Sequence, residues 1–301
     1  MGRFSRLDLL LLLMVGIWGA NFSAIKYALR DFPEVSFNAM RLVLAGAVFL
    51  VAMLRHQRQS AAGDRPPRPR LTRREWATLV MLALVGTVLY QLFFLAGLAR
   101  TSVANSALMF GCTPVAVAIM SSVAGHERLT AARWGGAALS LAGIYALVGH
   151  RAELSAATFV GDLLVFCGML CWSLYSVAAQ PMLKRHSPLV VTGWAMMIGA
   201  VLYGIGAFPS LITTDWARIS ALSWLLMAAS SLLALALAYM IWYTAVQKIG
   251  SARTAVYSNL TPIVAMVVAA VWLGERITGQ QLLGAALILS GIAVTRLNPA
   301  V

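Results

Sequence analysis

Ten long apolar runs constrain this chain more than any other feature of its sequence. Each run approaches the roughly 20 apolar residues that an α-helix needs to cross the hydrocarbon core of a bilayer. The runs are continuous rather than alternating, and backbone groups in lipid must pair within their own segment, so the runs predict helices and not barrel strands. The expected spans are 7–29, 34–54, 76–98, 102–124, 130–149, 157–180, 188–209, 221–245, 252–273 and 278–297.

Composition excludes a soluble domain. Of the 301 residues, 60% are hydrophobic and 11% are charged, whereas a soluble domain has about 25% charged residues. The first run follows Arg3 and Arg6, as a secretory signal would, but its apolar character continues to Leu29. The candidate cleavage site at 18–20 also begins with a bulky tryptophan where a small residue is needed. The chain is therefore expected to be an all-α polytopic membrane protein that retains its first helix.

The distribution of basic residues predicts the orientation. If the N-terminus lies inside, most of the 23 Lys and Arg residues fall on the inner side, including the arginine-rich stretch 55–74. The positive-inside rule then places both termini in the cytoplasm, in a bacterial inner membrane. The same stretch carries no aromatic residue before Trp76 that could stack on a base. It is expected to be a loop facing lipid headgroups rather than a nucleic-acid site.

The chain repeats itself. Shifting it by 148 residues aligns 99–148 with 247–296 without a gap, and Thr113-Pro114 then matches Thr261-Pro262. At an offset of 154, Trp18 also matches Trp172, and position 8 matches position 162, both Asp. Apolar composition alone does not place these pairs in register. The sequence predicts two repeats, 1–150 and 151–301.

The repeats are expected to have opposite orientations, because each holds five spans and five is an odd number. Inverted repeats around an axis in the membrane plane are a common architecture of transporters, with a binding site near the midplane between the halves. Such a duplication offers two similar packings, each open to one side. It favours a transporter over a membrane enzyme or a passive scaffold.

Several motifs carry a family resemblance. They are the paired Thr-Pro and Glu-Arg-x-Thr segments, the stretch WGANF at 18–22, and Arg41 opening the second run. They resemble the drug/metabolite transporter superfamily, and within it the ten-helix EamA-type bacterial exporters, which include amino-acid exporters. The resemblance covers nearly the whole chain. It implies that the first four spans and the sixth to ninth surround a central cavity, with the fifth and tenth at the periphery. One departure is His126, which stands where the second repeat has Gly274.

Each repeat carries a proline inside an apolar run. Pro262 has no N–H, so the carbonyl of Ser258 is expected to lose its helical partner, and Pro114 is expected to do the same to Phe110. A free carbonyl in hydrocarbon is tolerated only against protein or a water-filled cavity. We therefore expect each proline to bend a cavity-lining helix and to leave a polar group facing inward.

Three charged residues at the ends of spans have expected structural or gating roles, alongside the two prolines. Glu127 and Glu275 end their helices, so each is expected to cap the next helix or to pair with the adjacent arginine. Arg41 has two possible roles. It either extends to the outer surface, as long basic side chains do near helix ends, or holds a carboxylate.

The substrate-binding candidates are aromatic, amide and hydroxyl side chains inside the spans. Tyr90 and Phe94 share a helix face, and Asn105, Met109 and Thr113 would form one stripe at four-residue spacing. For any single aromatic residue, packing or an interfacial belt is the alternative. The full set is Trp18, Asn21, Phe22, Tyr90, Gln91, Phe94, Asn105, Met109, Thr113, Trp172, Tyr175, Tyr239, Trp242, Tyr243, Tyr257 and Thr261.

Some chemistries lack their residues in this sequence. No Asp or Glu lies in the middle of a span, and all four histidines fall in loops. A proton relay normally places ionisable groups inside the membrane, so a facilitator is favoured. The P-loop, HExxH and GxSxG motifs are missing, and the chain is not expected to be an enzyme. Cys112, Cys167 and Cys171 are interpreted as packing residues, and no metal or cofactor site is expected.

These observations together predict the function. A phosphorylated substrate would need several inward basic residues, and Arg41 is the only candidate. The expected activity is export of small amphipathic metabolites, foremost amino acids, by facilitated alternating access. An exporter of drugs or other toxic compounds and a proton-coupled metabolite antiporter are the alternatives. The particular substrate and the oligomeric state stay open, with a monomer as one possibility.

Overall fold

A computed structural model describes residues 5–61, 71–125 and 156–296, with a few isolated positions between 135 and 143. Each expected span other than 130–149 coincides with a helical stretch. Glu127 and most of that fifth span lie outside the described residues. Within the described part of the chain, eight helical stretches are long and apolar enough to cross a membrane.

The first half is built from helices that mostly follow the expected spans. The third span is divided by a π-helical turn and the fourth by a break before its proline. The elements are α1 (Arg6–Ala28), α2 (Glu34–Ala61), α3 (Arg73–Ala83), η1 (Leu84–Leu89, π-helix), α4 (Tyr90–Arg100), α5 (Val103–Phe110) and α6 (Thr113–Val123).

The second half repeats this order, including a π-helical turn in its third long stretch. Its elements are α8 (Ala156–Ala178), α9 (Gln180–Leu183), α10 (Pro188–Thr213), η2 (Trp216–Arg218), α11 (Ala221–Ala229), η3 (Ser230–Leu237, π-helix), α12 (Ala238–Ile249), α13 (Ser251–Ala255), η4 (Val256–Leu260, 3₁₀-helix), α14 (Thr261–Val268), η5 (Ala269–Leu273, π-helix) and α15 (Gly279–Arg296).

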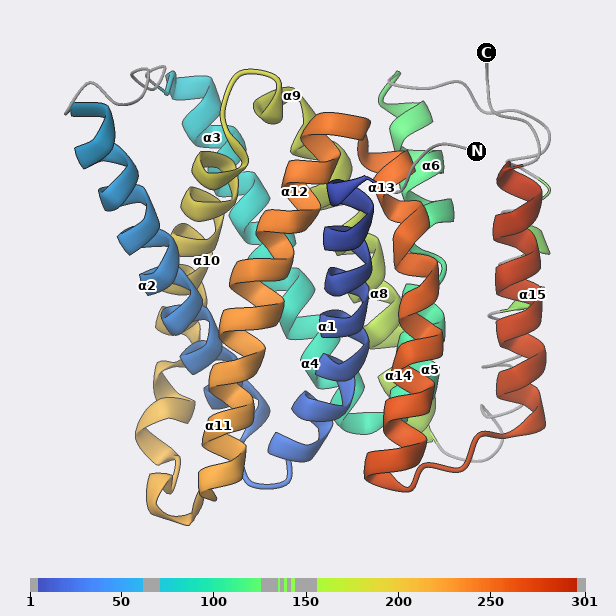
Figure 1. Cartoon of the computed structure of the whole chain (residues 1–301). Coiled ribbons are helices and arrows are strands. Elements are labelled where there is room, and N and C mark those ends of the chain that lie inside the picture. Colours follow the sequence, from blue (N-terminus) through green and yellow to red (C-terminus); the bar gives the residue numbers. More distant parts are fainter. Residues whose placement is uncertain are drawn as a thin grey trace.

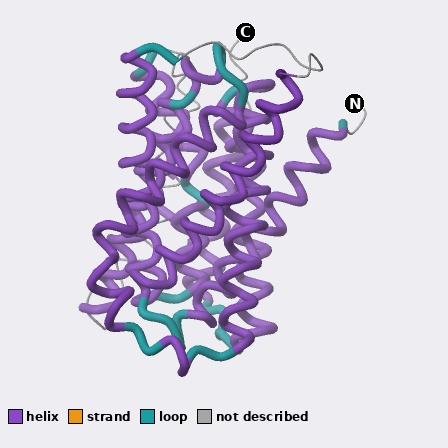
Figure 2. The backbone as a smooth tube through the Cα atoms, turned by 90° about the vertical axis from the view of Figure 1, so that its left-hand side faces the viewer, coloured by secondary structure: helices purple, strands orange, loops and turns teal. Residues whose placement is uncertain are grey.

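The two halves run in opposite directions through the bundle. In Figure 1, α1 begins at the upper end, near the N-terminus, and runs downward, whereas its counterpart α8 runs upward to α9. Figure 2 shows that the helices span the length of the bundle, with most of the loops gathered at its two ends. This is the arrangement that an odd number of spans per repeat requires.

Each half packs on the other through matching helices. In the first half, α4 lies along α8, and in the second half α11 and α12 lie along α1. Likewise, α1 of the first half packs on α14 of the second, and its counterpart α8 packs on α5 and α6 of the first. The helices α2 and α10 pack on each other. The core is therefore shared between the halves, and neither half encloses a core of its own.

The pairing of α4 with α8 depends on glycine. A Cβ atom added at Gly97 of α4 would lie 2.6 Å from Cγ2 of Val165 and 2.7 Å from the carbonyl oxygen of Gly161 in α8. Small residues allow helix backbones to approach in this way inside a bilayer, where apolar burial does not drive helices together. The contact holds α8 against the helix that carries Tyr90 and Gln91.

A pair of aspartates repeats one contact in both halves. Asp8, in the first turn of α1, accepts a hydrogen bond from the hydroxyl of Tyr257. Asp162, in the N-terminal part of α8, accepts hydrogen bonds from the hydroxyl of Thr101 and the amide of Asn105. In each case the aspartate of one half binds the start of the fourth span of the other half. These contacts lie at opposite ends of the bundle.

The proline segments differ from the expectation of a bent, continuous helix. Pro114 and Pro262 each stand at the start of a new helix, α6 and α14, where the missing N–H costs nothing. The carbonyl of Ser258 accepts a hydrogen bond from the N–H of Thr261. The expectation of a free carbonyl at Ser258 is therefore wrong, because the 3₁₀ turn η4 pairs it three residues ahead.

Glu275 caps a helix, but not the one expected. Its carboxylate accepts hydrogen bonds from the backbone N–H groups of Val103 at 3.0 Å and Ala104 at 3.3 Å, in the first turn of α5. The expectation that it caps the next helix along the chain, α15, is wrong, because α14 and η5 bring Glu275 beside the other half. A carboxylate at this position pairs N–H groups that have no partner inside the helix.

Candidate functional site

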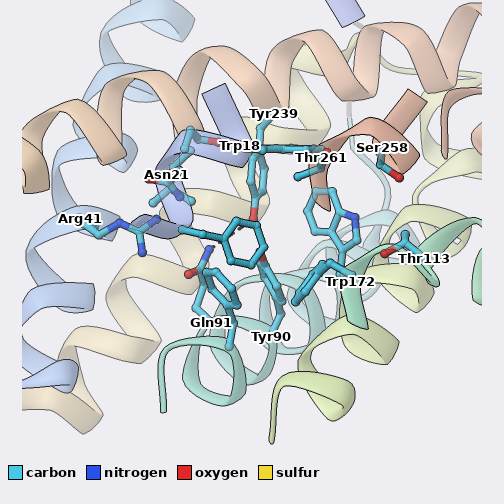
Figure 3. A pocket seen from close by; sticks show the side chains of 15 residues that line it. Trp18, Asn21, Arg41, Tyr90, Gln91, Thr113, Trp172, Tyr239, Ser258 and Thr261 are labelled. Carbon is cyan, nitrogen blue, oxygen red and sulfur yellow. Dashed lines mark hydrogen bonds between the residues drawn. The ribbon is translucent and has the colours of Figure 1, made fainter. Parts of the chain in front are cut away.

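A cavity of about 50 Å³ lies between the two halves. Its wall takes side chains from the helices of the first, second, third, fourth, sixth, eighth and ninth spans, so it belongs to both repeats. The lining residues are Trp18, Asn21, Phe22, Arg41, Tyr90, Gln91, Phe94, Phe110, Thr113, Trp172, Ala234, Leu235, Tyr239, Ser258 and Thr261. Figure 3 shows ten of them labelled around the cavity.

Trp172 stands at the centre of the aromatic part of this wall. Its ring centroid lies 5.4 Å from Trp18, 5.4 Å from Tyr90 and 5.0 Å from Tyr239. These separations fall in the range where aromatic pairs attract through their edges and faces. The cluster joins α1 and α4 of the first half to α8 and α12 of the second, so the cavity wall is also a joint between the halves.

The indole N–H of Trp18 is held by the π-helical turn η3. Trp18 Nε1 donates to the carbonyl oxygen of Ala234 at 3.1 Å. Beside it, the hydroxyl of Ser230 donates to the amide oxygen of Asn21. A π-helical turn loosens the regular ladder of backbone hydrogen bonds, and such turns are frequent at functional sites. The turn therefore holds two of the cavity residues of α1 in place.

A second aromatic group forms the part of the wall nearer to α5. Tyr90 and Phe94 stack with centroids 5.7 Å apart, as expected for two residues on one helix face. Phe22 meets Phe94 edge-on at 5.3 Å, and Phe110 lies 5.4 Å from Phe94. The sequence reasoning did not select Phe110, because it marked that segment by its polar stripe.

Three of the expected aromatic residues lie behind the wall. Tyr175, Trp242 and Tyr243 are buried next to Trp172, with Trp242 5.5 Å from it and Tyr175 5.1 Å from Tyr243. They support the cavity residues and do not line the cavity. The spacing of residues along α12 could not distinguish Tyr239, which faces the cavity, from Tyr243 one turn later, because both share one helix face.

Three further candidates lie away from the cavity. The side-chain amide of Asn105 is used in packing contacts: its nitrogen donates to Asp162, and its oxygen accepts a hydrogen bond from Gln281 at 3.0 Å. Met109 is buried in the packing between helices, and Tyr257 binds Asp8. The expected stripe fails because the chain turns at 111–112 between α5 and α6, so only Thr113 reaches the wall.

Arg41 is inside the protein, and the expectation that it extends to the outer surface is wrong. Its residue surface is 1% exposed, and it lines the cavity. Nη1 donates a long hydrogen bond of 3.4 Å to Asn38, Nε has no partner, and the guanidinium carbon lies 5.4 Å from the ring centre of Phe37. The alternative, that Arg41 holds a carboxylate, stays a prediction.

Two other polar groups of the cavity wall are buried without a hydrogen-bond partner. They are the amide oxygen of Gln91 and the hydroxyl of Thr261. Buried polar groups are normally paired, so unpaired ones in a cavity are available for a ligand or water. Ligand pockets typically enclose about 300–1,000 Å³, and this cavity is much smaller. The structure therefore has the cavity contracted, and the aromatic side chains must separate before a ligand of ordinary size can enter.

Comparison with known proteins finds relatives that match nearly the whole chain. A probable terminal-alkyne amino-acid exporter of Streptantibioticus cattleyicolor is 27% identical, over 94% of this chain and 90% of that protein. A probable amino-acid metabolite efflux pump of Escherichia coli is 25% identical, over 96% of this chain and 95% of its own. The uncharacterized transporter YyaM of Bacillus subtilis is 27% identical, over 91% of this chain and 88% of the relative.

A solved crystal structure shares the fold. It superimposes with a TM-score of 0.69 at 22% identity and covers 97% of both chains. The model of the EamA-like transporter family matches the chain twice, at residues 5–149 and 159–297. The two matches correspond to the two halves that run in opposite directions. This chain is a multi-pass membrane transporter and belongs to the EamA-like transporter family.

Proposed function

We propose that this transporter exports small amphipathic metabolites, foremost amino acids, by facilitated alternating access. The observation that carries the proposal is the cavity wall, in which aromatic rings, amides, hydroxyls and one guanidinium from both halves meet. Such a wall suits a molecule with one apolar end and one polar end. Two relatives whose names include amino-acid export or amino-acid metabolite efflux support the same substrate class.

The two ends of the bundle offer contacts that could open in alternation. At the end away from the termini, Glu275 caps α5, and the ammonium of Lys26 donates to the carbonyl of Leu98 at 2.7 Å. At the other end, Asp8 binds Tyr257. The contacts of Glu275 and of Asp8 join the two halves, whereas that of Lys26 joins α1 to α4 within the first half. Breaking the contact between the halves at one end while keeping the other would open the cavity to one side.

Facilitation and orientation belong to the same proposal. Among the described residues that line the cavity there is no Asp or Glu, so the wall offers no carboxylate to carry a coupling proton. The surplus of Lys and Arg at one end supports cytoplasmic termini in a bacterial inner membrane. The repeats 1–150 and 151–301 would then be the two moving units.

Reconstitution into liposomes tests this function. The protein would be supplied with a panel of labelled amino acids, a sugar phosphate and a lipophilic cation, with and without a pH gradient. Counterflow of amino acids that needs no gradient is the expected result. Flux that depends strictly on the gradient would contradict facilitation, and flux of the sugar phosphate or the cation alone would contradict the substrate class.

A further inference from the structure

The charge of Arg41 is not neutralised inside the protein. A guanidinium stays protonated in proteins, and a buried charge is unfavourable unless an opposite charge or several hydrogen bonds accompany it. The described wall of the cavity contains no Asp or Glu. Asn38 accepts one long hydrogen bond of 3.4 Å, and Phe37 offers its ring face. The cavity therefore carries a net positive charge.

An anionic group on the ligand would remove this unfavourable state. The flat guanidinium matches a carboxylate or a phosphate through two parallel hydrogen bonds. A phosphate would bring about two negative charges at neutral pH into a wall that supplies one basic group and is otherwise mostly aromatic. A carboxylate brings one negative charge, so the pair is neutral and fits an apolar surrounding.

The position of Arg41 also orients the rest of the ligand. In Figure 3, Arg41 enters from the side opposite Thr113, and the rings of Trp172, Tyr90 and Tyr239 lie between them. A carboxylate on Arg41 therefore places the remainder of the molecule against these rings. An aromatic or branched aliphatic group would fill that space through apolar burial and ring contacts.

The described wall provides no carboxylate for an ammonium group, and a ring face is a weaker partner for a cation than a carboxylate is. Its unpaired acceptors are neutral oxygens, the amide oxygen of Gln91 and the hydroxyl of Thr261. Neutral acceptors compensate a buried positive charge poorly, and the nearby guanidinium repels it. A ligand gains from its carboxylate and apolar group, and gains little from an α-amino group.

We propose that the cavity selects apolar monocarboxylates by pairing the carboxylate with Arg41, and that an α-amino group is not needed for recognition. This inference rests on the proposed function of the same cavity and makes its substrate class more specific. It includes aromatic and branched amino acids, their N-acylated derivatives and the corresponding acids without nitrogen.

A panel of matched phenyl compounds tests the selection. L-Phenylalanine, N-acetyl-L-phenylalanine and 3-phenylpropanoate keep the carboxylate, whereas L-phenylalanine methyl ester and 2-phenylethylamine lack it. Each would compete for counterflow in proteoliposomes, and each would be tested for protection of the purified protein against thermal unfolding. We expect the three acids to compete within about tenfold of one another. The ester and the amine should compete at least about 30-fold more weakly than the acids, a difference of about 2 kcal/mol.

Two variants assign the selection to Arg41. Arg41→Gln should reduce competition by the acids about 30-fold and erase their advantage over the ester. Arg41→Lys should retain part of it, because the charge remains and the two-pronged geometry is lost. Arg218→Gln is the control, since Arg218 is exposed and pairs with Asp215 outside the cavity. Without ligand, Arg41→Gln should unfold at no lower temperature than the wild type, because it removes an unpaired buried charge.

The outcomes separate this inference from the function on which it rests. If the ester and the amine compete as well as the acids, or if Arg41→Gln keeps the preference for acids, the inference is wrong while transport stands. A less stable Arg41→Gln variant that still prefers acids would show that Arg41 supports the fold instead. If no compound of the panel or of the amino-acid set moves through the wild-type protein, both the inference and the proposed function are wrong.

Discussion

Trp18 and Trp172, which occupy matching positions in the two repeats, contact each other edge-to-face with ring centroids 5.4 Å apart and planes at 89°. Two equivalent residues can meet only near the axis that relates their repeats, so this contact marks the centre of the bundle. In the alternating access proposed for this protein, an exchange of the packings of the two halves would change how these rings meet. The pair therefore joins the cavity wall to the transition between states.

Replacing Trp172 with alanine should reduce transport about tenfold or more, which is about 1.4 kcal/mol. The substitution removes ring contacts with Trp18, Tyr90 and Tyr239 at the wall of the cavity. Trp172→Phe keeps an aromatic ring and should retain more activity. Initial rates of counterflow in proteoliposomes, normalised to folded protein, are the measurement.

Trp76→Ala is the matched control for this experiment. Trp76 packs on Trp194 with centroids 4.8 Å apart and does not line the cavity, so its loss removes a similar ring elsewhere. Transport should stay within about twofold of the wild type. Wild-type flux in folded Trp172→Ala would remove Trp172 from the site.

Adding one methyl group at Gly97 should destabilise the protein. The new Cβ atom would lie 2.6 Å from Val165 of α8 and must push the two helices apart. Overpacking of this kind typically costs about 1–3 kcal/mol. Unfolding of purified Gly97→Ala, by heat or denaturant, measures the loss. Gly204→Ala is the control, because nothing lies within 4 Å of its added Cβ, and equal stability of the two variants would contradict the close packing of α4 and α8.

The helices and the duplication could be predicted from the sequence because both depend on local patterns. Long apolar runs have few alternatives in a bilayer, and Trp18 and Trp172 keep their register across the repeats. Face-sharing at four-residue spacing also predicted the stacking of Tyr90 on Phe94. These features need no knowledge of which helices lie side by side.

The rest of the site depended on breaks and on contacts between distant segments. The turn at 111–112 separates Asn105 from Thr113. Four-residue spacing does not reveal this turn, and Pro114, which favours the start of a helix, was interpreted as a bend inside one. The burial of Arg41 depends on neighbours in other helices, and so does the capping of α5 by Glu275. Because both residues lie near the ends of spans, the sequence suggested that Arg41 extends to the membrane surface and that Glu275 caps the next helix.

Glu275→Gln should weaken the closure at the end of the bundle away from the termini. The amide keeps the shape of the side chain but removes the charge that stabilises the N–H groups at the start of α5. Loss of such a cap costs about 0.5–2 kcal/mol. The free energy of unfolding should fall by that amount. Glu34→Gln, which breaks a partly exposed pair with Arg100, should change it less, because exposed ion pairs contribute little. Equal effects would contradict the capping role.

Asp31 should make stability depend on pH in the acid range. Asp31 lies in the connection between α1 and α2, and the hydroxyls of Ser220 and Ser223, at the start of α11, donate hydrogen bonds to its carboxylate. These hydrogen bonds lower the pKa of Asp31. A lowered pKa in the folded state stabilises the protein above the ordinary value of about 3.9. This contribution is lost as the pH falls through the folded value. The stability advantage of wild type over Asp31→Asn, measured by unfolding at several pH values, should be constant near neutrality and shrink below about pH 4. A difference that does not change with pH would contradict this role.

The inverted insertion of the two halves can be measured directly by labelling from one side of the membrane. Ala124, after α6, and Arg276, after η5, are exposed and lie beyond the fourth span of each repeat. In Figure 1, α6 and α14 run in opposite directions, so their C-terminal ends lie at opposite ends of the bundle. Each would be replaced by cysteine in a background without Cys112, Cys167 and Cys171, and treated in intact cells with a membrane-impermeant maleimide. We predict that Arg276→Cys is labelled from outside and that Ala124→Cys is labelled only after the membrane is opened. Labelling of both positions from the same side would contradict two inverted halves around a shared cavity, and with it the mechanism of transport proposed for this protein.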